Sequence, residues 1–182
     1  ALLKATLING TRRITGADAV AALEGDPNYH QGFGRIDMSN TVPNSLSPKL
    51  ELVFDDTWKK KGRMFTQTGQ RFRYRIKVGD GLPLRLCLAW TDPGARGLQN
   101  SLLLLADNTF QTKWIGNEQA AAFMHIAGAQ RDPNNNVQVV RIEKPPPGDY
   151  TIAIMASMVL FPPQSFALVV SGDLQSKLIP LD

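Results

Sequence analysis

From Lys49 onward the chain is divided into short β-type stretches by turns that are rich in glycine and proline. The turns include Gly79-Asp80-Gly81 and Pro145-Pro146-Pro147-Gly148, both typical breaks between strands. Stretches suited to strands lie near 49–54, 63–67, 71–78, 84–91, 101–107, 111–115, 137–143, 149–156 and 164–171. Because no helical crossovers separate them, the sequence predicts a mainly β fold, an antiparallel jelly-roll β-sandwich of about eight or nine strands.

Two segments depart from this β pattern. Ala1 to Thr11 is a short apolar, helix-like run, and residues 15–24 are compatible with a further helical turn or two. A helix shorter than about 12–15 residues is marginal in water, so the first run needs a partner surface. In the sandwich, the stretch 116–136 is expected to be a long excursion between strands, with a helical turn conceivable at 120–124.

Pro43 to Pro48 is rich in turn formers and marks a natural boundary. The sequence therefore predicts a short N-terminal α-helical extension ahead of the sandwich and a brief tail after it. The predicted division is a terminal segment at residues 1–43, the jelly-roll domain at residues 44–175 and a C-terminal tail at residues 176–182.

Composition is that of a globular chain, with 43% hydrophobic and 20% charged residues and no apolar run near the roughly 18 residues of a membrane span. The single cysteine, Cys87, rules out an internal disulfide, and its place in an apolar strand favours a small core residue. The formal charge is +4, and residues 71–78 alternate so that their four cations share one strand face. Phe72 and Tyr74 lie on the other face, so a solvated strand is favoured over a nucleic-acid surface.

The first forty-odd residues contain two motifs that occur together in one enzyme family. Ala1-Leu2-Leu3-Lys4-Ala5-Thr6-Leu7 is similar to a helix that reads Ala-Leu-(Leu/Ile)-Lys-x-x-Leu. Gly32-Phe33-Gly34-Arg35-Ile36-Asp37 is similar to a Gly-x-Gly-x-(Val/Ile)-(Asp/Asn) segment. In this order they resemble the last helix and the closing segment of the catalytic domain of a subtilisin-like serine protease.

The glycine pair in that second motif also invites comparison with a dinucleotide-binding loop. The third glycine of such a loop is missing, and no strand–helix unit follows. Tight turning or close backbone approach explains Gly32 and Gly34 better. Arg35 and Asp37 are expected to make local ionic or hydrogen-bond contacts.

The sandwich portion continues the resemblance. Leu86-Cys87-Leu88-Ala89-Trp90-Thr91-Asp92-Pro93 is similar to the Leu-x-Leu-x-Trp-(Thr/Ser)-Asp-Pro strand and turn of subtilases that carry a jelly-roll domain behind the catalytic domain. Asp132-Pro133-Asn134-Asn135-Asn136-Val137 and Pro147-Gly148-Asp149-Tyr150-Thr151-Ile152 are similar to two later segments of that domain. The resemblance thus covers nearly the whole chain.

The resemblance implies a serine endopeptidase as the parent protein, but the catalytic triad is absent from this sequence. The family nucleophile lies in a Gly-Thr-Ser-(Met/Ala)-Ala segment, which does not occur here, and there is no Gly-x-Ser-x-Gly elbow. His30 and His125 are the only histidines, and neither has an evident acid partner. We therefore expect an inactive, non-catalytic part that supports the stability and the substrate groove of a catalytic domain. The alternative is a free-standing β-sandwich module that binds carbohydrate or protein.

Expected partners follow from the same resemblance. They are the catalytic domain of the same protein and the protein or peptide substrates of the parent, with no nucleic acid and no membrane expected. The family implies a secreted or cell-envelope location. In the family helix, the buried side chains would include Leu2, Leu3, Leu7 and Ile8. Without that cover the helix must fray, fold back on the sandwich or find another chain, and we expect poor order before Pro43 or self-association through residues 1–43.

Calcium is the cofactor that the resemblance raises, since jelly-roll domains of the family often hold it with carboxylate and backbone oxygens. The family strand after the Trp turn reads Asn-Asp-Leu-Asp-Leu, and here Ser101 and Leu103 replace both acids. The oxygen ligands that remain are Asp92, Asn100, Asp132 and the run Asn134-Asn135-Asn136. Turn formation alone explains these residues. The sequence therefore disfavours calcium without excluding it, and assigns no residue a catalytic, cofactor-binding or metal-binding role.

Overall fold

A computed structural model describes residues 1–16, 27–28, 30–60, 62–118, 124–126 and 129–181, with 124–126 and 129–131 described by their backbone alone. No helix in these ranges has the length and apolar character to cross a membrane. The elements are α1 (Leu2–Asn9), the 3-10 turn η2 (Met38–Asn40), β1 (Glu51–Asp56), β2 (Arg71–Val78), β3 (Leu84–Ala89), β4 (Asn100–Asn108), β5 (Lys113–Ile115), β6 (Met124–Ile126), β7 (Ala129–Arg131), β8 (Val137–Ile142), β9 (Gly148–Val159), β10 (Ala167–Gly172) and β11 (Ile179–Pro180).

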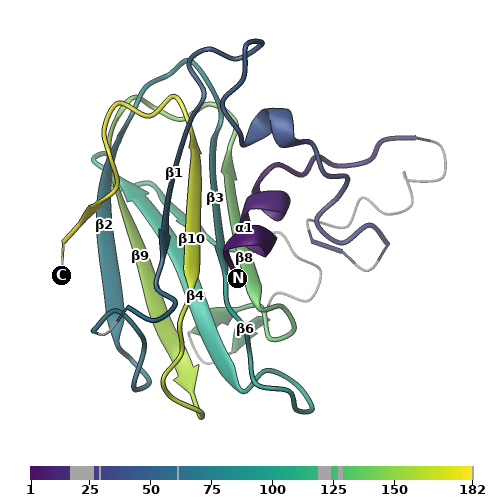
Figure 1. Cartoon of the computed structure of the whole chain (residues 1–182), viewed down its shortest axis with the longest axis vertical. Helices are drawn as coiled ribbons and strands as arrows, with labels where there is room; N and C mark the ends of the chain where they lie inside the picture. Colours follow the sequence, from purple (N-terminus) through teal and green to yellow (C-terminus); the bar gives the residue numbers. More distant parts are fainter. Residues whose placement is uncertain (17–26, 29, 61, 119–123, 127–128, 182) are drawn as a thin grey trace.

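Two antiparallel sheets form the sandwich (Figure 1), with the strand orders β1-β10-β3-β8 and β11-β2-β9-β4-β5. Most neighbours are far apart in sequence, as in the pairing of β1 with β10 from Glu51 opposite Gly172 to Asp56 opposite Ala167. Without the two-residue edge strand β11, these are the strand orders of an eight-stranded jelly roll. The predicted jelly-roll sandwich is therefore confirmed, and α1 is its short helical extension.

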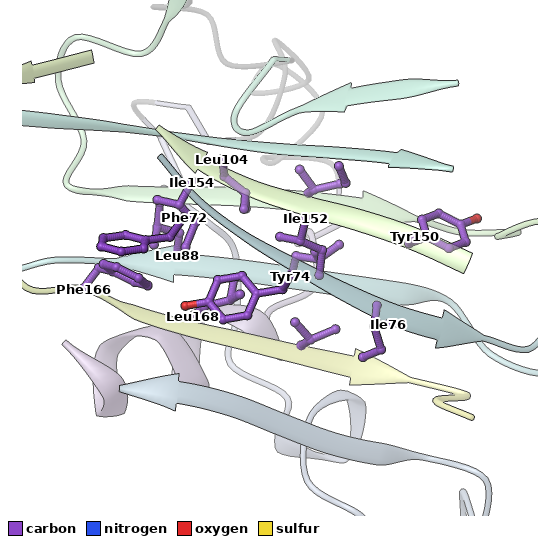
Figure 2. Close-up of a cluster of buried hydrophobic side chains, with 14 of the residues drawn as sticks. Phe72, Tyr74, Ile76, Leu88, Leu104, Tyr150, Ile152, Ile154, Phe166 and Leu168 are labelled. Atoms are coloured by element: carbon purple, nitrogen blue, oxygen red, sulfur yellow. The ribbon is translucent and has the colours of Figure 1, made fainter. Parts of the chain in front are cut away.

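The core lies between the sheets because each strand turns alternate residues inward. β2 shows this most strictly, since its apolar residues are buried and its four cations are exposed. Side chains from both sheets meet in the core (Figure 2), among them Phe72, Tyr74, Ile152 and Ile154 from one sheet and Leu88 and Leu168 from the other. At one end, the rings of Phe65, Phe72 and Phe166 pack with centroids 4.9–5.7 Å apart.

Two local elements differ from the sequence prediction. Residues 63–67 form no strand, because only Phe65 pairs, through a single bridge to Gln164. The excursion 116–136 contains the hairpin of β6 and β7. The helical turns suggested for 15–24 and for 120–124 fall largely outside the described residues, although Met124 itself belongs to β6.

The expected C-terminal tail also contains structure. Ile179 and Pro180 pair with Arg75 and Tyr74, so β11 extends the five-stranded sheet beyond β2. A backbone hydrogen bond from Leu181 N to Arg73 O, at 2.9 Å, continues the pairing. Two residues that include a proline give no alternation for a sequence pattern to detect.

A charged cluster closes the edge of the sandwich between β1 and β2. Tyr74 Oη donates to Asp55 Oδ2 at 2.8 Å, and Arg63 Nη2 donates to Tyr74 Oη at 2.7 Å. Lys60 Nζ and Arg63 Nη2 lie 2.7 Å and 3.2 Å from the two carboxylate oxygens of Asp55. Burial raises the pKa of Asp55, but hydrogen bonds from Lys60 and Tyr74 and the charge of Arg63 outweigh it and hold the pKa below its ordinary value.

The substitution Asp55→Asn should destabilise the fold by about 1–3 kcal/mol at neutral pH, because three donors lose a charged acceptor. The pKa of Asp55 is lower in the folded chain than in the unfolded chain. Its contribution is therefore present above the ordinary carboxylate pKa of about 4 and is lost as the pH falls through the folded-state value. Denaturant unfolding over a series of pH values should show a shallower acid loss in Asp55→Asn than in the parent chain. The exposed Asp149→Asn is the control, and identical acid loss in both variants would contradict the assignment.

Candidate functional site

Helix α1 lies on the outer face of the four-stranded sheet, against β10 and β3 (Figure 1). Ala5 is fully buried there, and Leu2 and Ile8 on either side of it are partly buried. The sheet meets the helix with a layer of small or branched side chains, Cys87, Ala89, Val137 and Val169. Eight residues are too few for a stable isolated helix, so this packing is what holds α1 in place.

A buried polar network joins the end of α1 to the sheet. Asn9 Nδ2 donates to Ser171 Oγ at 2.8 Å and to Thr41 Oγ1 at 3.4 Å. Ser171 Oγ donates in turn to Asn40 O at 3.1 Å, and Asn40 Nδ2 donates to Gly10 O at 3.3 Å. Because Asn9, Thr41 and Ser171 are almost fully buried, breaking this network would leave polar groups without water.

Two arginines hold the chain directly after α1. Arg85 on β3 and Arg141 on β8 stand opposite each other in the strand register. Arg85 Nη1 donates to Thr11 O at 3.2 Å, and Arg141 Nη2 donates to Thr11 Oγ1 at 2.6 Å. Burial lowers the pKa of both guanidinium groups, and the negative charge of Glu143 partly offsets this. The N-terminal segment is thus fixed to the sheet by packing at Ala5 and by hydrogen bonds at Thr11.

The Gly-x-Gly turn crosses the same segment. Gly32 and Gly34 have φ values of +56° and +94°, in the region that favours glycine. A Cβ on Gly34 would lie 2.3 Å from Arg12 O, where Arg12 and Arg35 exchange backbone hydrogen bonds of 2.9 and 2.8 Å. The interpretation of this pair as a tight turn with close backbone approach is confirmed. Asp37 makes the expected local contact, with Oδ2 3.5 Å from Arg12 Nε.

The face of α1 that points away from the sheet is open. Leu3 is 72% exposed, whereas Leu2, Leu7 and Ile8 are half-buried. Phe54 is 57% exposed and stands opposite Val169 in the register, on the same outer face of the sheet as α1. Of the alternatives expected for the first forty-odd residues, α1 folds back on the sandwich instead of fraying, and it still presents apolar surface. Self-association through residues 1–43 stays a prediction.

Protein donors occupy the first group of oxygen ligands that the sequence left for calcium. Asp92 Oδ1 accepts from Asn100 N at 2.7 Å, and Asp92 Oδ2 accepts from Gln99 N at 2.8 Å. Asn100 Oδ1 accepts from the backbone of Leu160 and Phe161 at 2.9 and 3.0 Å. Both side chains therefore organise loops, as turn-forming Asp and Asn do.

The second group is engaged in the same way. Asp132 is buried and accepts from Asn117 Nδ2 at 2.8 Å, from Asn135 Nδ2 at 2.6 Å and from Asn134 N at 2.9 Å. Leu103, which stands in place of one family acid, is only 7% exposed. Across the part of the chain that the structure describes, no three His, Cys, Asp or Glu side chains are grouped to hold a metal ion.

The remaining candidates for chemistry lie in unrelated places. His30 is exposed in the turn after Asn28, whose Oδ1 accepts from His30 N at 2.9 Å. His125 belongs to β6, where its backbone pairs with Gln130, and its side chain lies outside the described part of the chain. Cys87 is fully buried beneath α1, and burial raises the pKa of its thiol.

Comparison with known proteins gives one distant relative. The chain is 26% identical over 176 residues to the serine protease/ABC transporter B family protein tagA of Dictyostelium discoideum. The match covers 93% of this chain but 10% of that protein, so the chain spans about a tenth of the relative's length. No family model matches the chain. The similarity is therefore to a protein named as a serine protease, and it includes most of residues 1–43 together with the sandwich.

The docking of α1 predicts a contrast between two aspartate substitutions on opposite faces of the helix. Ala5→Asp should displace α1 and expose Cys87, so that a maleimide reagent labels the thiol under native conditions at least about tenfold faster. Leu3→Asp changes an exposed position and should leave Cys87 protected. Equal labelling rates in the two variants would mean that α1 does not cover the sheet.

The engaged oxygens predict that calcium has little effect on unfolding. A ligand at a hundredfold excess over its Kd stabilises a fold by about 2.7 kcal/mol, which would raise the midpoint of this chain by roughly 5 °C or more. We expect a smaller shift when millimolar calcium or a chelator is added. A shift of that size, removed by Asp92→Asn or Asp132→Asn, would show that these side chains still form a site.

Proposed function

We propose that this chain is a non-catalytic C-terminal part of a subtilisin-like serine endopeptidase, and that its jelly roll stabilises the adjoining catalytic domain. The observation that carries the proposal is the two-sided environment of α1. One side is docked on the sandwich through Ala5 and Asn9, and the other side presents Leu3 to solvent. A short helix in this position can be shared between two domains, and the resemblance makes it the last helix of a catalytic domain.

The comparison supports the coarser part of this proposal, a link to a serine-protease-related protein whose alignment covers 93% of this chain. The subtilisin-like assignment rests on the residue motifs. These include the helix at Ala1–Leu7, the Gly-x-Gly turn at 32–37 and the Trp-Thr-Asp-Pro turn at 90–93. A secreted or cell-envelope location, and protein or peptide substrates for the parent, follow from the same assignment.

The contacts of α1 suggest how support would work. A catalytic domain that packs on the Leu3 face is linked to the sandwich through Ala5, the Asn9 network and the arginine contacts at Thr11. Moving α1 away from the sandwich would break buried hydrogen bonds and expose the apolar sheet face around Cys87. Such a link raises the barrier to unfolding rather than changing the chemistry, so its effect would be on kinetic stability.

The test uses the full-length protein and the chain alone, each with a fluorophosphonate probe. We expect the probe to label a serine in the full-length protein outside this chain, and no serine within the chain. Leu3→Asp should shorten the half-life of the labelling activity at elevated temperature about fivefold or more, because an apolar side chain of the interface is replaced by a charge.

Phe110→Asp is the matched control, since Phe110 is also exposed, at 68%, but lies in the turn after β4 in the other sheet. Both variants should unfold like the parent chain when the sandwich is studied alone. Labelling of a serine in this chain would contradict the non-catalytic assignment. Equal half-lives for the two variants would contradict the supporting role of α1.

A further inference from the structure

Two loops lie side by side at one end of the sandwich, the lower end in Figure 1. One is the segment 57–70 between β1 and β2, and the other is the segment 160–166 between β9 and β10. Thr57 N donates to Phe166 O at 2.9 Å, and Phe65 and Gln164 exchange backbone hydrogen bonds of 2.9 and 2.8 Å. The two loops therefore form one connected surface.

This surface presents large apolar side chains to solvent. Trp58 is 65% exposed, Leu160 is 58% exposed and Phe161 is 56% exposed. The same two loops also supply Phe65 and Phe166 to the core, where both are fully buried. The apolar side chains of the loops thus point in two directions. Those that point outward leave more than half of their surface in water, and exposed apolar groups on adjoining loops mark a candidate site of interaction.

The exposed side chains are held on an ordered backbone. Asn100 is fully buried and accepts from the backbone N–H groups of Leu160 and Phe161 at 2.9 and 3.0 Å. Its Nδ2 donates to Phe161 O at 2.9 Å and to Gln164 Oε1 at 2.8 Å. Because one buried side chain fixes this loop, binding through Leu160 and Phe161 costs little ordering entropy.

The charge of the surface is positive. Among the described residues, the segment 57–70 contains Lys59, Lys60 and Arg63 and no acidic residue, and the segment 160–166 is uncharged. The neighbouring Asp56 accepts a hydrogen bond from Trp58 N at its Oδ1, at 3.1 Å. Lys60 and Arg63 share the single carboxylate of Asp55. Lys59 Nζ lies 6.0 Å from the centre of the Trp58 ring, so an indole and an ammonium group are presented together.

We propose that this surface, defined by Trp58, Lys59, Leu160 and Phe161, docks on the face of an anionic phospholipid membrane. Tryptophan and phenylalanine insert at the boundary between headgroups and acyl chains, and lysine beside them is attracted to anionic headgroups. Protein interfaces, in contrast, are depleted of lysine. The sequence expectation of no membrane partner rested on the lack of a spanning-length apolar run, which does not bear on side chains at loop tips.

The test is cosedimentation of the full chain with phosphatidylcholine vesicles, with and without phosphatidylserine. We expect binding to the phosphatidylserine vesicles that weakens as salt is raised. Trp58→Ala and Phe161→Ala should each weaken binding at least about tenfold, because each removes an inserted side chain. Lys59→Glu should weaken it roughly fivefold or more.

The controls stand at the opposite end of the sandwich. Leu46→Ala removes an apolar side chain that is 88% exposed before β1, and Lys144→Glu reverses an exposed charge between β8 and β9. Both should bind vesicles like the parent chain, and all variants should keep its thermal midpoint. Failure to bind phosphatidylserine vesicles would overturn the proposal, as would equal loss in the control variants. It would also be overturned by a dimer in sedimentation equilibrium that Trp58→Ala dissolves, since the occupant would then be a second copy of the chain.

Discussion

The packing of Ala5 on the outer face of the four-stranded sheet governs how the first part of this chain relates to the rest. That packing is possible because the central strands β3 and β10 carry apolar or small side chains on both faces. Every residue of β10 is buried, and so is every residue of β3 except Arg85. A strand covered on both sides needs a second layer, and α1 supplies it. The five-stranded sheet has no such demand at β2, where the outward residues are charged.

This difference between strands is visible in the sequence. The stretches Leu84–Ala89 and Ala167–Gly172 lack the strict alternation of Arg71–Val78, and an uninterrupted apolar strand indicates cover on both faces. The jelly-roll class followed from strand spacing and turns, because these depend on local chemistry. The position of α1 depends on which face of the sheet is left uncovered by the rest of the chain. The eight residues of the helix do not themselves specify that face.

In the candidate sites, too, local backbone geometry could be predicted from the sequence, whereas contacts between distant residues could not. The tight turn at Gly32 and Gly34 could be predicted because glycine is chosen for backbone geometry, and the structure has the positive φ values that this implies. The hydrogen bonds of Asn100 could not be predicted, since its partners Leu160 and Phe161 lie some sixty positions away. A family motif identified the region of the glycine turn and that of Asn100. For Asn100, only the folded chain shows that its side-chain amide holds a loop in place.

The hydrogen bonds of Asn100 explain why the loop after β9 can keep apolar side chains exposed. A polar side chain buried at the base of a loop allows apolar groups at the loop tip to stay in water without collapsing onto the core, because the backbone is already satisfied. Leu160 and Phe161 are in this position, whereas Leu3 is exposed because the opposite face of its helix is docked. The two apolar surfaces therefore have different physical origins and lie on different parts of the fold, one over the outer face of a sheet and one at a loop end. A neighbouring domain on α1 would leave the loop end free, so the two proposed roles do not compete for one surface.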